Sequence, residues 1–97
     1  MIFMCLMDYA EPATVAQVRP EHRQYMFSLI RADKVIVAGS FRPDDDGGLF
    51  LYEAQSLDEA RRLVNDDPYV KRGAIRSYRL REYETHGVNA ALLRVTG

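Results

Sequence analysis

Hydrophobic and polar residues follow two different spacings along this chain, and each spacing predicts a different element. Short apolar runs between polar residues are typical of buried strands, whereas apolar residues three and four positions apart indicate a helix. Strands are predicted at residues 2–8, 35–38, 49–54 and 74–83. A first helix is predicted over residues 20–32, and a second begins after Ser56. Residues 10–18 fit either a loop or a weak helical turn.

The boundaries of these helices are marked by capping residues and prolines. Pro20 suits a first helical turn, and Ser56 with Glu59 three residues later forms a capping box. Pro68 ends the second helix, because a residue before proline avoids helical geometry. The side chains expected to face the core are Tyr25, Met26, Leu29 and Ile30 in the first helix, and Leu57, Ala60, Leu63 and Val64 in the second.

The segment Asp44–Gly48 has strong turn chemistry and predicts a hairpin between the second and third strands. We read Gly47 and Gly48 as part of that turn. The resulting order is βαββαβ, which matches an α+β, ferredoxin-like fold over residues 1–83. Residues 84–97 form a C-terminal tail, and its segment Val88–Val95 either packs on a partner subunit or pairs as an extra strand.

The first strand is apolar on both faces, which bears on oligomeric state. Residues at even and odd positions of residues 2–7 are all apolar, so both sides of this strand avoid water. Two helices cover only one face of an open sheet. We therefore expect a homodimer that packs sheet against sheet, with a second copy covering the other face.

Composition narrows the function classes. The 97 residues carry 13 Lys and Arg against 14 Asp and Glu, a net charge of −1, which argues against nucleic acid or an acidic membrane as partner. Met1–Met7 is apolar but lacks a basic start and stops at Asp8, so neither a signal peptide nor a membrane helix is expected and the cytoplasm is the expected location.

His22 and Asp67 are the candidate catalytic pair. His22 shares the apolar stripe of the first helix, so its ring is expected to face the sheet, and the positive end of the helix dipole would favour a neutral ring. Asp67 precedes Pro68 and suits the N-cap of a short turn. The purely structural interpretation is that His22 is a histidine at the start of a helix and Asp67 is a capping residue. The functional interpretation is that Asp67 orients or ionises His22, and the two interpretations are compatible.

The remaining polar residues give weaker signals. Cys5 lies in an apolar strand and is expected in the core, and His86 lies near the tail without metal-ligand spacing. No glycine-rich phosphate loop is present, so neither a metal nor an organic cofactor is predicted. The arginines of the last strand are expected on a solvated edge, and the alternative is that one of them reaches a carboxylate substrate; they are Arg76, Arg79 and Arg81.

Three short motifs in a fixed order resemble the YciI-related (YCII) family. They are Arg19-Pro20-Glu21-His22, Val37-Ala38-Gly39-Ser40 and Asp66-Asp67-Pro68-Tyr69-Val70, with Ser56-Leu57-Asp58-Glu59-Ala60 ahead of the last. The resemblance covers residues 1 to about 83 and implies a ferredoxin-like domain that dimerises into an α/β barrel. It also implies an active-site histidine and aspartate, which fall on His22 and Asp67. Two departures stand out: Ser40 replaces a frequent proline, and the last strand ends in Arg81-Glu82-Tyr83 where a basic residue, Pro and Phe are common.

The leading functional hypothesis is a small cofactor-independent lyase or isomerase. His22 would move a proton on a small cyclic or aromatic acid, Asp67 would orient it, and Arg19, Ser40 and Tyr69 would bind substrate near the rim. Related dimeric barrels act on such molecules by proton transfer, isomerisation, elimination or cofactor-free oxygenation. The alternatives are a non-catalytic small-ligand-binding or regulatory dimer in the same cleft, and a structural dimer whose cleft is filled.

Overall fold

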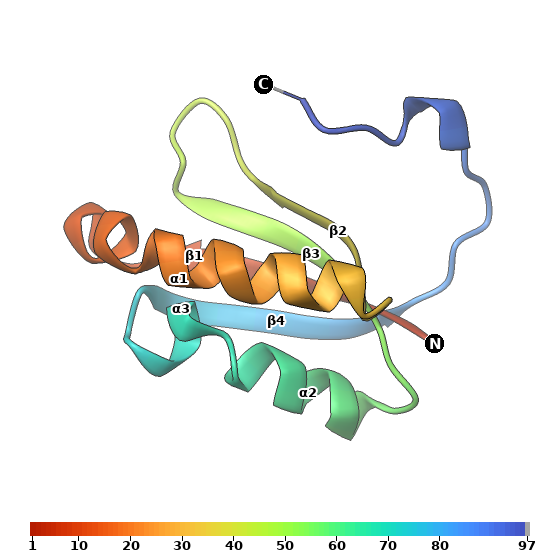
Figure 1. Ribbon diagram of the computed structural model, residues 1–97, viewed down its shortest axis with the longest axis horizontal. Coiled ribbons are helices and arrows are strands. Elements are labelled where there is room, and N and C mark those ends of the chain that lie inside the picture. Colours follow the sequence, from red (N-terminus) through yellow and green to blue (C-terminus); the bar gives the residue numbers. More distant parts are fainter. Residues whose placement is uncertain (97) are drawn as a thin grey trace.

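Four antiparallel strands form one sheet in the order β2-β3-β1-β4 (Figure 1). The computed structural model describes residues 1–96. The elements in chain order are β1 (Ile2–Tyr9), α1 (Pro12–Arg31), β2 (Val35–Ser40), β3 (Gly47–Glu53), α2 (Leu57–Asn65), α3 (Pro68–Lys71), β4 (Ile75–Tyr83) and a 3₁₀ turn, η1 (Ala90–Leu92). This is the predicted ferredoxin-like α+β order, with α3 as a short addition before the last strand.

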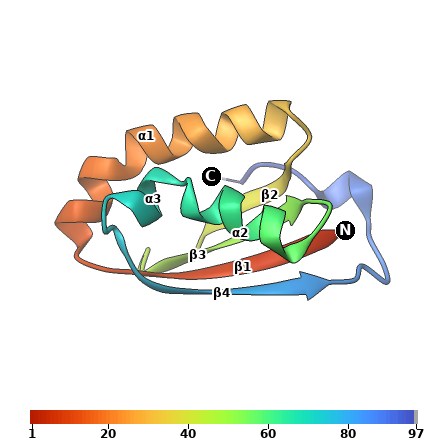
Figure 2. The ribbon, with the colours of Figure 1, turned by 90° about the horizontal axis from the view of Figure 1, so that it is seen from below.

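All three α-helices lie on the same face of the sheet, so the domain has two layers (Figure 2). β1 and β3 are the central strands, and β2 and β4 are the edge strands. β1 pairs with β3 on one side and with β4 on the other. Among residues 1–96, no helix combines the length and the apolar character needed to cross a membrane.

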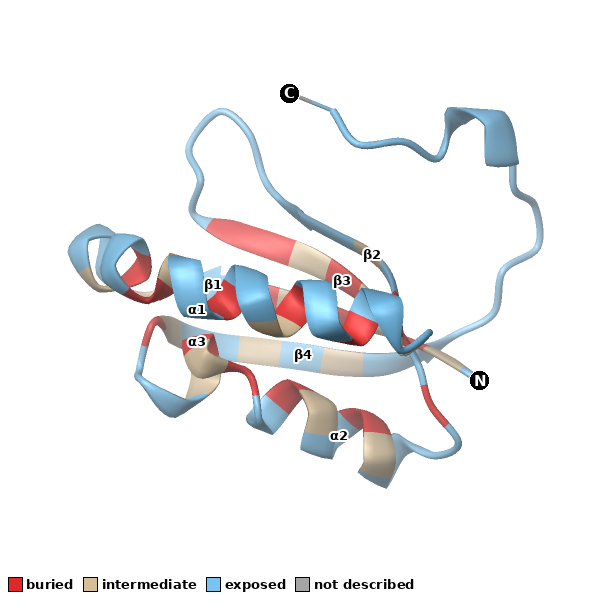
Figure 3. Ribbon diagram, viewed as in Figure 1, coloured by how far each residue is buried: buried red, intermediate tan, exposed pale blue. Residues whose placement is uncertain are grey.

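The alternation along β1 separates a core face from an outward face. Phe3, Cys5 and Met7 are at most 1% exposed and face the helices, whereas Met4 and Leu6 face the other way and are only half-buried. Buried positions also recur along α1, α2 and β3 (Figure 3). The outward face continues into the neighbouring strand, because Met4 pairs with Leu51. The sheet therefore presents an outward face that no helix covers, apolar on β1 and β3 and bordered on β4 by Arg79 and Arg81, the partners of Leu6 and Met4.

The first helix is longer than the sequence pattern predicts. It begins at Pro12 instead of Pro20, so the prediction of a loop or weak turn for residues 10–18 is wrong. Val15 and Val18 are buried against the sheet, and this packing extends the apolar stripe backward by two turns. Pro20 removes one backbone hydrogen bond, but it lies on the exposed face with Ala16, whose carbonyl is left to water.

Gly47 and Gly48 belong to β3 and not to the turn, which corrects their predicted placement. A Cβ at Gly47 would lie 2.4 Å from the carbonyl oxygen of Met7, and one at Gly48 would lie 2.7 Å from that of Gly39. These glycines allow close backbone contact between strands. The turn itself is made by the aspartates before them, where Asp45 takes a positive φ of 53°.

The second helix is capped as the sequence predicts. The Ser56 side chain accepts from the Glu59 amide at 3.1 Å, while the Glu59 carboxylate accepts from the Gln55 amide at 2.9 Å. Ala60 and Val64 are buried and Leu63 is half-buried, but Leu57 is 42% exposed and does not reach the core. The side chain of Leu57 is at the first helical position, beyond the edge of the core.

Residues 84–96 of the tail pair with no strand of this chain, so the extra strand that was one of the two predicted roles is not formed here. The tail crosses the end of the sheet and returns beside β2, at a level between α1 and the sheet (Figures 1 and 2). Its apolar side chains are exposed, Val95 to 95%.

Candidate functional site

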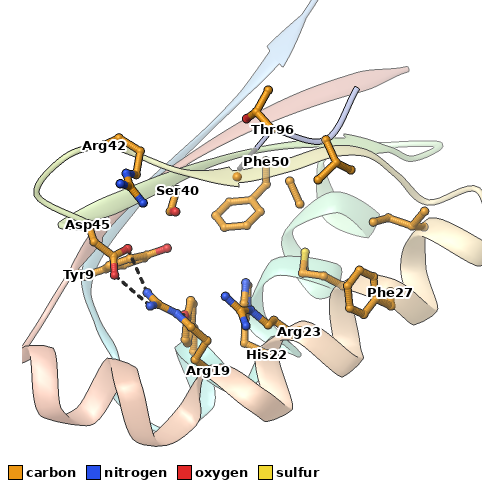
Figure 4. Close-up of a pocket in the computed structure, with 16 residues that line it drawn as sticks. Tyr9, Arg19, His22, Arg23, Phe27, Ser40, Arg42, Asp45, Phe50 and Thr96 are labelled. Carbon is orange, nitrogen blue, oxygen red and sulfur yellow. Dashed lines mark hydrogen bonds and ion pairs between the residues drawn. The ribbon is translucent and has the colours of Figure 1, made fainter. Parts of the chain in front are cut away.

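A cleft of about 500 Å³ lies between α1 and β2 on the helical side of the sheet (Figure 4). Its floor and walls come from β1, α1, β2, the β2–β3 loop, β3, α3 and the tail. The lining residues are Tyr9, Arg19, His22, Arg23, Met26, Phe27, Ile30, Ala38, Gly39, Ser40, Arg42, Asp45, Phe50, Tyr69, Val95 and Thr96. Because the cleft is open, it does not fit the third hypothesis, a structural dimer with a filled cleft.

His22 and Asp67 meet at the base of this cleft although 45 positions separate them. Nδ1 of His22 lies 2.8 Å from one carboxylate oxygen of Asp67 and 3.0 Å from the other. Since an ionised carboxylate only accepts hydrogen bonds, Nδ1 carries the proton and the neutral ring keeps its lone pair on Nε2. Nε2 has no partner among residues 1–96 and is not a buried orphan atom, so it is the nitrogen that faces the cleft.

Asp67 is fixed by its position before α3. Its side chain accepts from the Tyr69 amide at 2.9 Å, which caps the short helix, and it is fully buried. Pro68 at the first helical position sets the direction of the turn. Capping and orientation of His22 thus use the same carboxylate.

Aromatic rings hold the imidazole from its other sides. The His22 ring stacks on Tyr69 with 3.8 Å between centroids, and Phe50 meets it edge-on at 5.5 Å. Tyr9 in turn packs edge-on against Tyr69 at 5.3 Å. Burial raises the pKa of the Tyr9 hydroxyl, so Tyr9 is a neutral wall of the site at ordinary pH.

Arg19 closes one end of the cleft. Its two terminal nitrogens bind both carboxylate oxygens of Asp45 at 2.9 and 3.0 Å, and its Nε donates to the Tyr69 hydroxyl at 2.9 Å. The hydrogen bond to Asp45 is the largest cause of the raised pKa of the Arg19 guanidinium, and the one to Tyr69 adds to it. Arg19 therefore ties α1 to the β2–β3 loop.

One element of the expected electrostatics is wrong. His22 was expected one turn into a helix, beside the positive end of its dipole. Because α1 begins at Pro12, His22 lies in the middle of the helix, ten residues from its start. The dipole acts only over the first turn, so the environment of the ring is set by Asp67, Tyr69 and Phe50.

The other predicted residues divide between the cleft and the surface. Arg19, Ser40 and Tyr69 all line the cleft, but Tyr69 is 1% exposed and lies against His22 at the base, not at the rim where it was predicted. The β4 arginines are exposed and none lines the cleft, so the suggestion that one of them reaches a substrate is wrong; they are Arg76, Arg79 and Arg81. On β4 their side chains lie on an edge strand, three strands from the cleft wall.

The remaining titratable residues form no site of their own. Cys5 is buried in the core, where desolvation raises the pKa of its thiol to about 12. His86 is exposed on the tail, 3.9 Å from Glu84. Within residues 1–96, no group of three or more His, Cys, Asp or Glu side chains is placed to hold a metal ion.

Sequence reasoning missed Arg23, Arg42 and Asp45. Arg23 could have been predicted, because it follows Arg19 by one helical turn and so lies on the same side of the helix. The location of the β2–β3 loop over the cleft is not indicated by any spacing in the sequence. Arg42 and Asp45 are in that loop (Figure 4).

Comparison with known proteins identifies one family and several solved structures that are similar to this chain. Residues 1–84 match the YCII-related domain. No curated protein matches the chain in sequence. The structure of 5-chloro-2-hydroxyhydroquinone dehydrochlorinase (TftG) from Burkholderia phenoliruptrix AC1100, in complex with 2,5-dihydroxybenzoquinone, is similar, with a TM-score of 0.74 and 25% identity over 90% of this chain and 96% of that one.

Two more distant structures share the fold. A protein from Nitrosomonas europaea described as an antibiotic biosynthesis monooxygenase has a TM-score of 0.62 and 8% identity, over 90% of this chain and 100% of its own. A dimeric ferredoxin-like protein from an uncultured marine organism has a TM-score of 0.56 and 9% identity, over 91% and 90%. These two likenesses concern the fold alone.

Proposed function

Because the chain belongs to the YCII-related domain family, we propose that it is a small lyase or isomerase in which His22 acts as a general base on a cyclic or aromatic acid. The observation that carries the proposal is the hydrogen bond from His22 Nδ1 to Asp67 at the base of an open cleft. This bond leaves Nε2 as the proton acceptor. The proposed reaction is proton transfer, and it requires no organic cofactor.

The proposed step begins when Nε2 takes an acidic proton from a carbon or hydroxyl of the substrate. The bonding electrons stay on the substrate, which then either expels a leaving group or accepts the proton back at another atom. The first course is an elimination and the second an isomerisation. The positive charge that forms on His22 lies against the buried carboxylate of Asp67, which stabilises it.

The shape of the cleft supports a flat substrate. Phe50 and Tyr69 present rings beside His22, and Phe27 adds a third ring farther along α1 (Figure 4). The dehydrochlorinase that resembles this chain was solved with a small quinone bound. Removal of HCl also requires a base that takes a proton, which is the role we assign to His22.

We include a homodimer in the proposal, with the two sheets packed face to face. The outward face of the sheet is apolar at its centre, where Met4 pairs with Leu51 and Leu6 pairs with Leu49. A dimeric ferredoxin-like protein is among the similar structures. A second copy would remove this face from water.

The direct test is proton exchange into candidate acids dissolved in D₂O. A panel of phenolic acids, lactones and cyclic keto acids is incubated with the protein, and loss of C–H signals is followed by ¹H NMR. We expect faster exchange for at least one compound, and the variant His22→Asn should lower that rate by roughly 10²–10⁴-fold, the usual contribution of a general base.

His86→Asn is the matched control, because His86 is exposed and does not line the cleft. Its exchange rate should equal that of the wild type. Equal rates for the wild type and His22→Asn across the panel would contradict the proposal. Binding without exchange would instead support the non-catalytic, ligand-binding alternative.

A further inference from the structure

The charges that line the cleft are unbalanced. Arg19, Arg23 and Arg42 contribute three guanidinium groups, and Asp45 is the one carboxylate among the lining residues described for the cleft. Asp45 is fully engaged, since both its oxygens accept from Arg19. The pair of Arg19 and Asp45 is therefore neutral, which leaves two positive charges among the lining residues. The buried carboxylate of Asp67 below them is engaged by His22 and the Tyr69 amide.

These two charges have no internal partner. Within residues 1–96, Arg23 and Arg42 take part in none of the ion pairs or side-chain hydrogen bonds. The two arginines come from opposite walls: Arg23 follows His22 on α1, and Arg42 extends from the loop after β2 toward the cleft (Figure 4). A guanidinium with its donors free is suited to bind a carboxylate.

The opposite end of the cleft is apolar. Phe27 and Ile30 continue along α1, and the tail contributes Val95. The cleft is therefore cationic around His22 and the β2–β3 loop, where Arg23 and Arg42 lie, and apolar toward the tail. A ligand that satisfies both ends has a flat apolar body and a negatively charged group.

We propose that Arg23 and Arg42 form an anion-binding subsite that grips the carboxylate of a small cyclic or aromatic acid from both sides. The ring of the acid then lies over Phe50, within reach of His22. This inference rests on the proposed function for the location of the reacting atoms, but the anion preference itself does not depend on catalysis.

The test compares carboxylates with their neutral amides, which have nearly the same shape. Calorimetry and thermal shift measure the binding of three matched pairs. The pairs are benzoate and benzamide, salicylate and salicylamide, and cyclohex-1-ene carboxylate and its amide. We expect at least one carboxylate to bind about tenfold tighter than its amide, as charge-assisted hydrogen bonds predict. Added salt should reduce that preference, since the subsite is open to solvent.

Three variants assign the preference to residues. Arg23→Gln and Arg42→Gln should each weaken carboxylate binding by roughly three- to tenfold, a range suited to exposed charges, without changing amide binding. Arg31→Gln is the control, because Arg31 is an exposed arginine of the same helix that does not line the cleft. It should bind both ligand types as the wild type does.

The outcomes separate this inference from the proposed function. If no carboxylate binds more tightly than its amide, or if Arg31→Gln weakens binding as much as Arg23→Gln, the subsite is refuted. His22→Asn should abolish proton exchange and keep the carboxylate preference. A carboxylate preference in a wild-type protein that exchanges protons with none of the candidate acids would uphold the subsite and refute the enzyme proposal.

Discussion

The imidazole of His22 lies flat on the ring of Tyr69, with 3.8 Å between centroids and only 5° between planes. The same short segment that supplies this stacking surface also supplies Asp67, which binds the edge of the imidazole. Residues 67–69 therefore fix His22 by its face and by its edge. One turn of chain therefore restrains the orientation of the imidazole ring.

The first prediction concerns the double role of Asp67. Asp67→Ala removes both the cap of α3 and the acceptor for His22 in a fully buried place, so we expect a loss of about 2–4 kcal/mol in the free energy of unfolding. Asp67→Asn keeps a capping oxygen and should cost only about 1 kcal/mol. Urea unfolding measures both.

Asp66→Ala is the matched control for these variants. Asp66 is exposed and its pairing with Lys71 is long, at 3.7 Å, so its removal should change stability by less than about 0.5 kcal/mol. An Asp67→Ala protein as stable as Asp66→Ala would show that the buried hydrogen bonds contribute little.

The second prediction separates the two faces of β1. Met4 points outward and Cys5 is buried in the core, so Met4→Asp should dissociate the homodimer and leave a folded monomer, whereas Cys5→Asp should unfold the chain. Light scattering and circular dichroism distinguish the two results. Gln24→Asp, on the exposed side of α1, should leave both properties unchanged. A wild-type monomer at micromolar concentration would contradict the dimer.

The third prediction is an alkaline loss of stability that depends on Cys5. Desolvation raises the pKa of its thiol from 9.0 to about 12, so between these values the unfolded chain releases the proton while the folded one keeps it. Stability therefore falls as pH rises through this window, with a slope of about 1.4 kcal/mol per pH unit from this group.

The measurement for Cys5 is the pH dependence of unfolding in the wild type and in Cys5→Ala. The variant is less stable by an amount that does not depend on pH below about pH 8, because it creates a small cavity. Between pH 9 and 11 the free energy of unfolding of the variant should fall less steeply with pH, by the contribution of about one proton. Parallel slopes for the two proteins would mean that the folded state does not suppress ionisation of this thiol.

The fourth prediction tests the close backbone contact in β3. A Cβ at Gly48 would meet the Gly39 carbonyl at 2.7 Å, whereas a Cβ at Gly39 would meet nothing within 4 Å. Gly48→Ala should therefore destabilise the fold by about 1–3 kcal/mol, and Gly39→Ala should be neutral or slightly stabilising. Thermal unfolding of the two variants gives the comparison, and equal melting temperatures would contradict it.

The order of the elements was predictable because periodicity and capping act locally. Ser56, Glu59 and Pro68 mark their boundaries by hydrogen bonds and steric clashes with near neighbours. The start of α1 was not predictable in this way, because Pro20 is a favourable first-turn residue and also a tolerable exposed interruption. Burial of Val15 and Val18 against the sheet decided between these, and burial is a tertiary effect.

The candidate site shows the same division. His22 and Asp67 were identifiable because the packing of both helices on one face brings their segments together. Arg42 and Asp45 were not, since the direction of the β2–β3 loop depends on the glycines that let β2, β3 and β1 approach closely. The β4 arginines looked equally suitable in sequence and lie away from the cleft.

The double duty of Asp67 has a consequence for judging related sequences. A protein of this fold that has ceased to catalyse still needs a residue to cap the turn before β4, so an aspartate at this position would persist for folding alone. Its presence in a relative is then a poor sign of activity. The position occupied by His22 has no capping role, and a change there would mark a homologue that has kept the architecture and lost the proposed reaction.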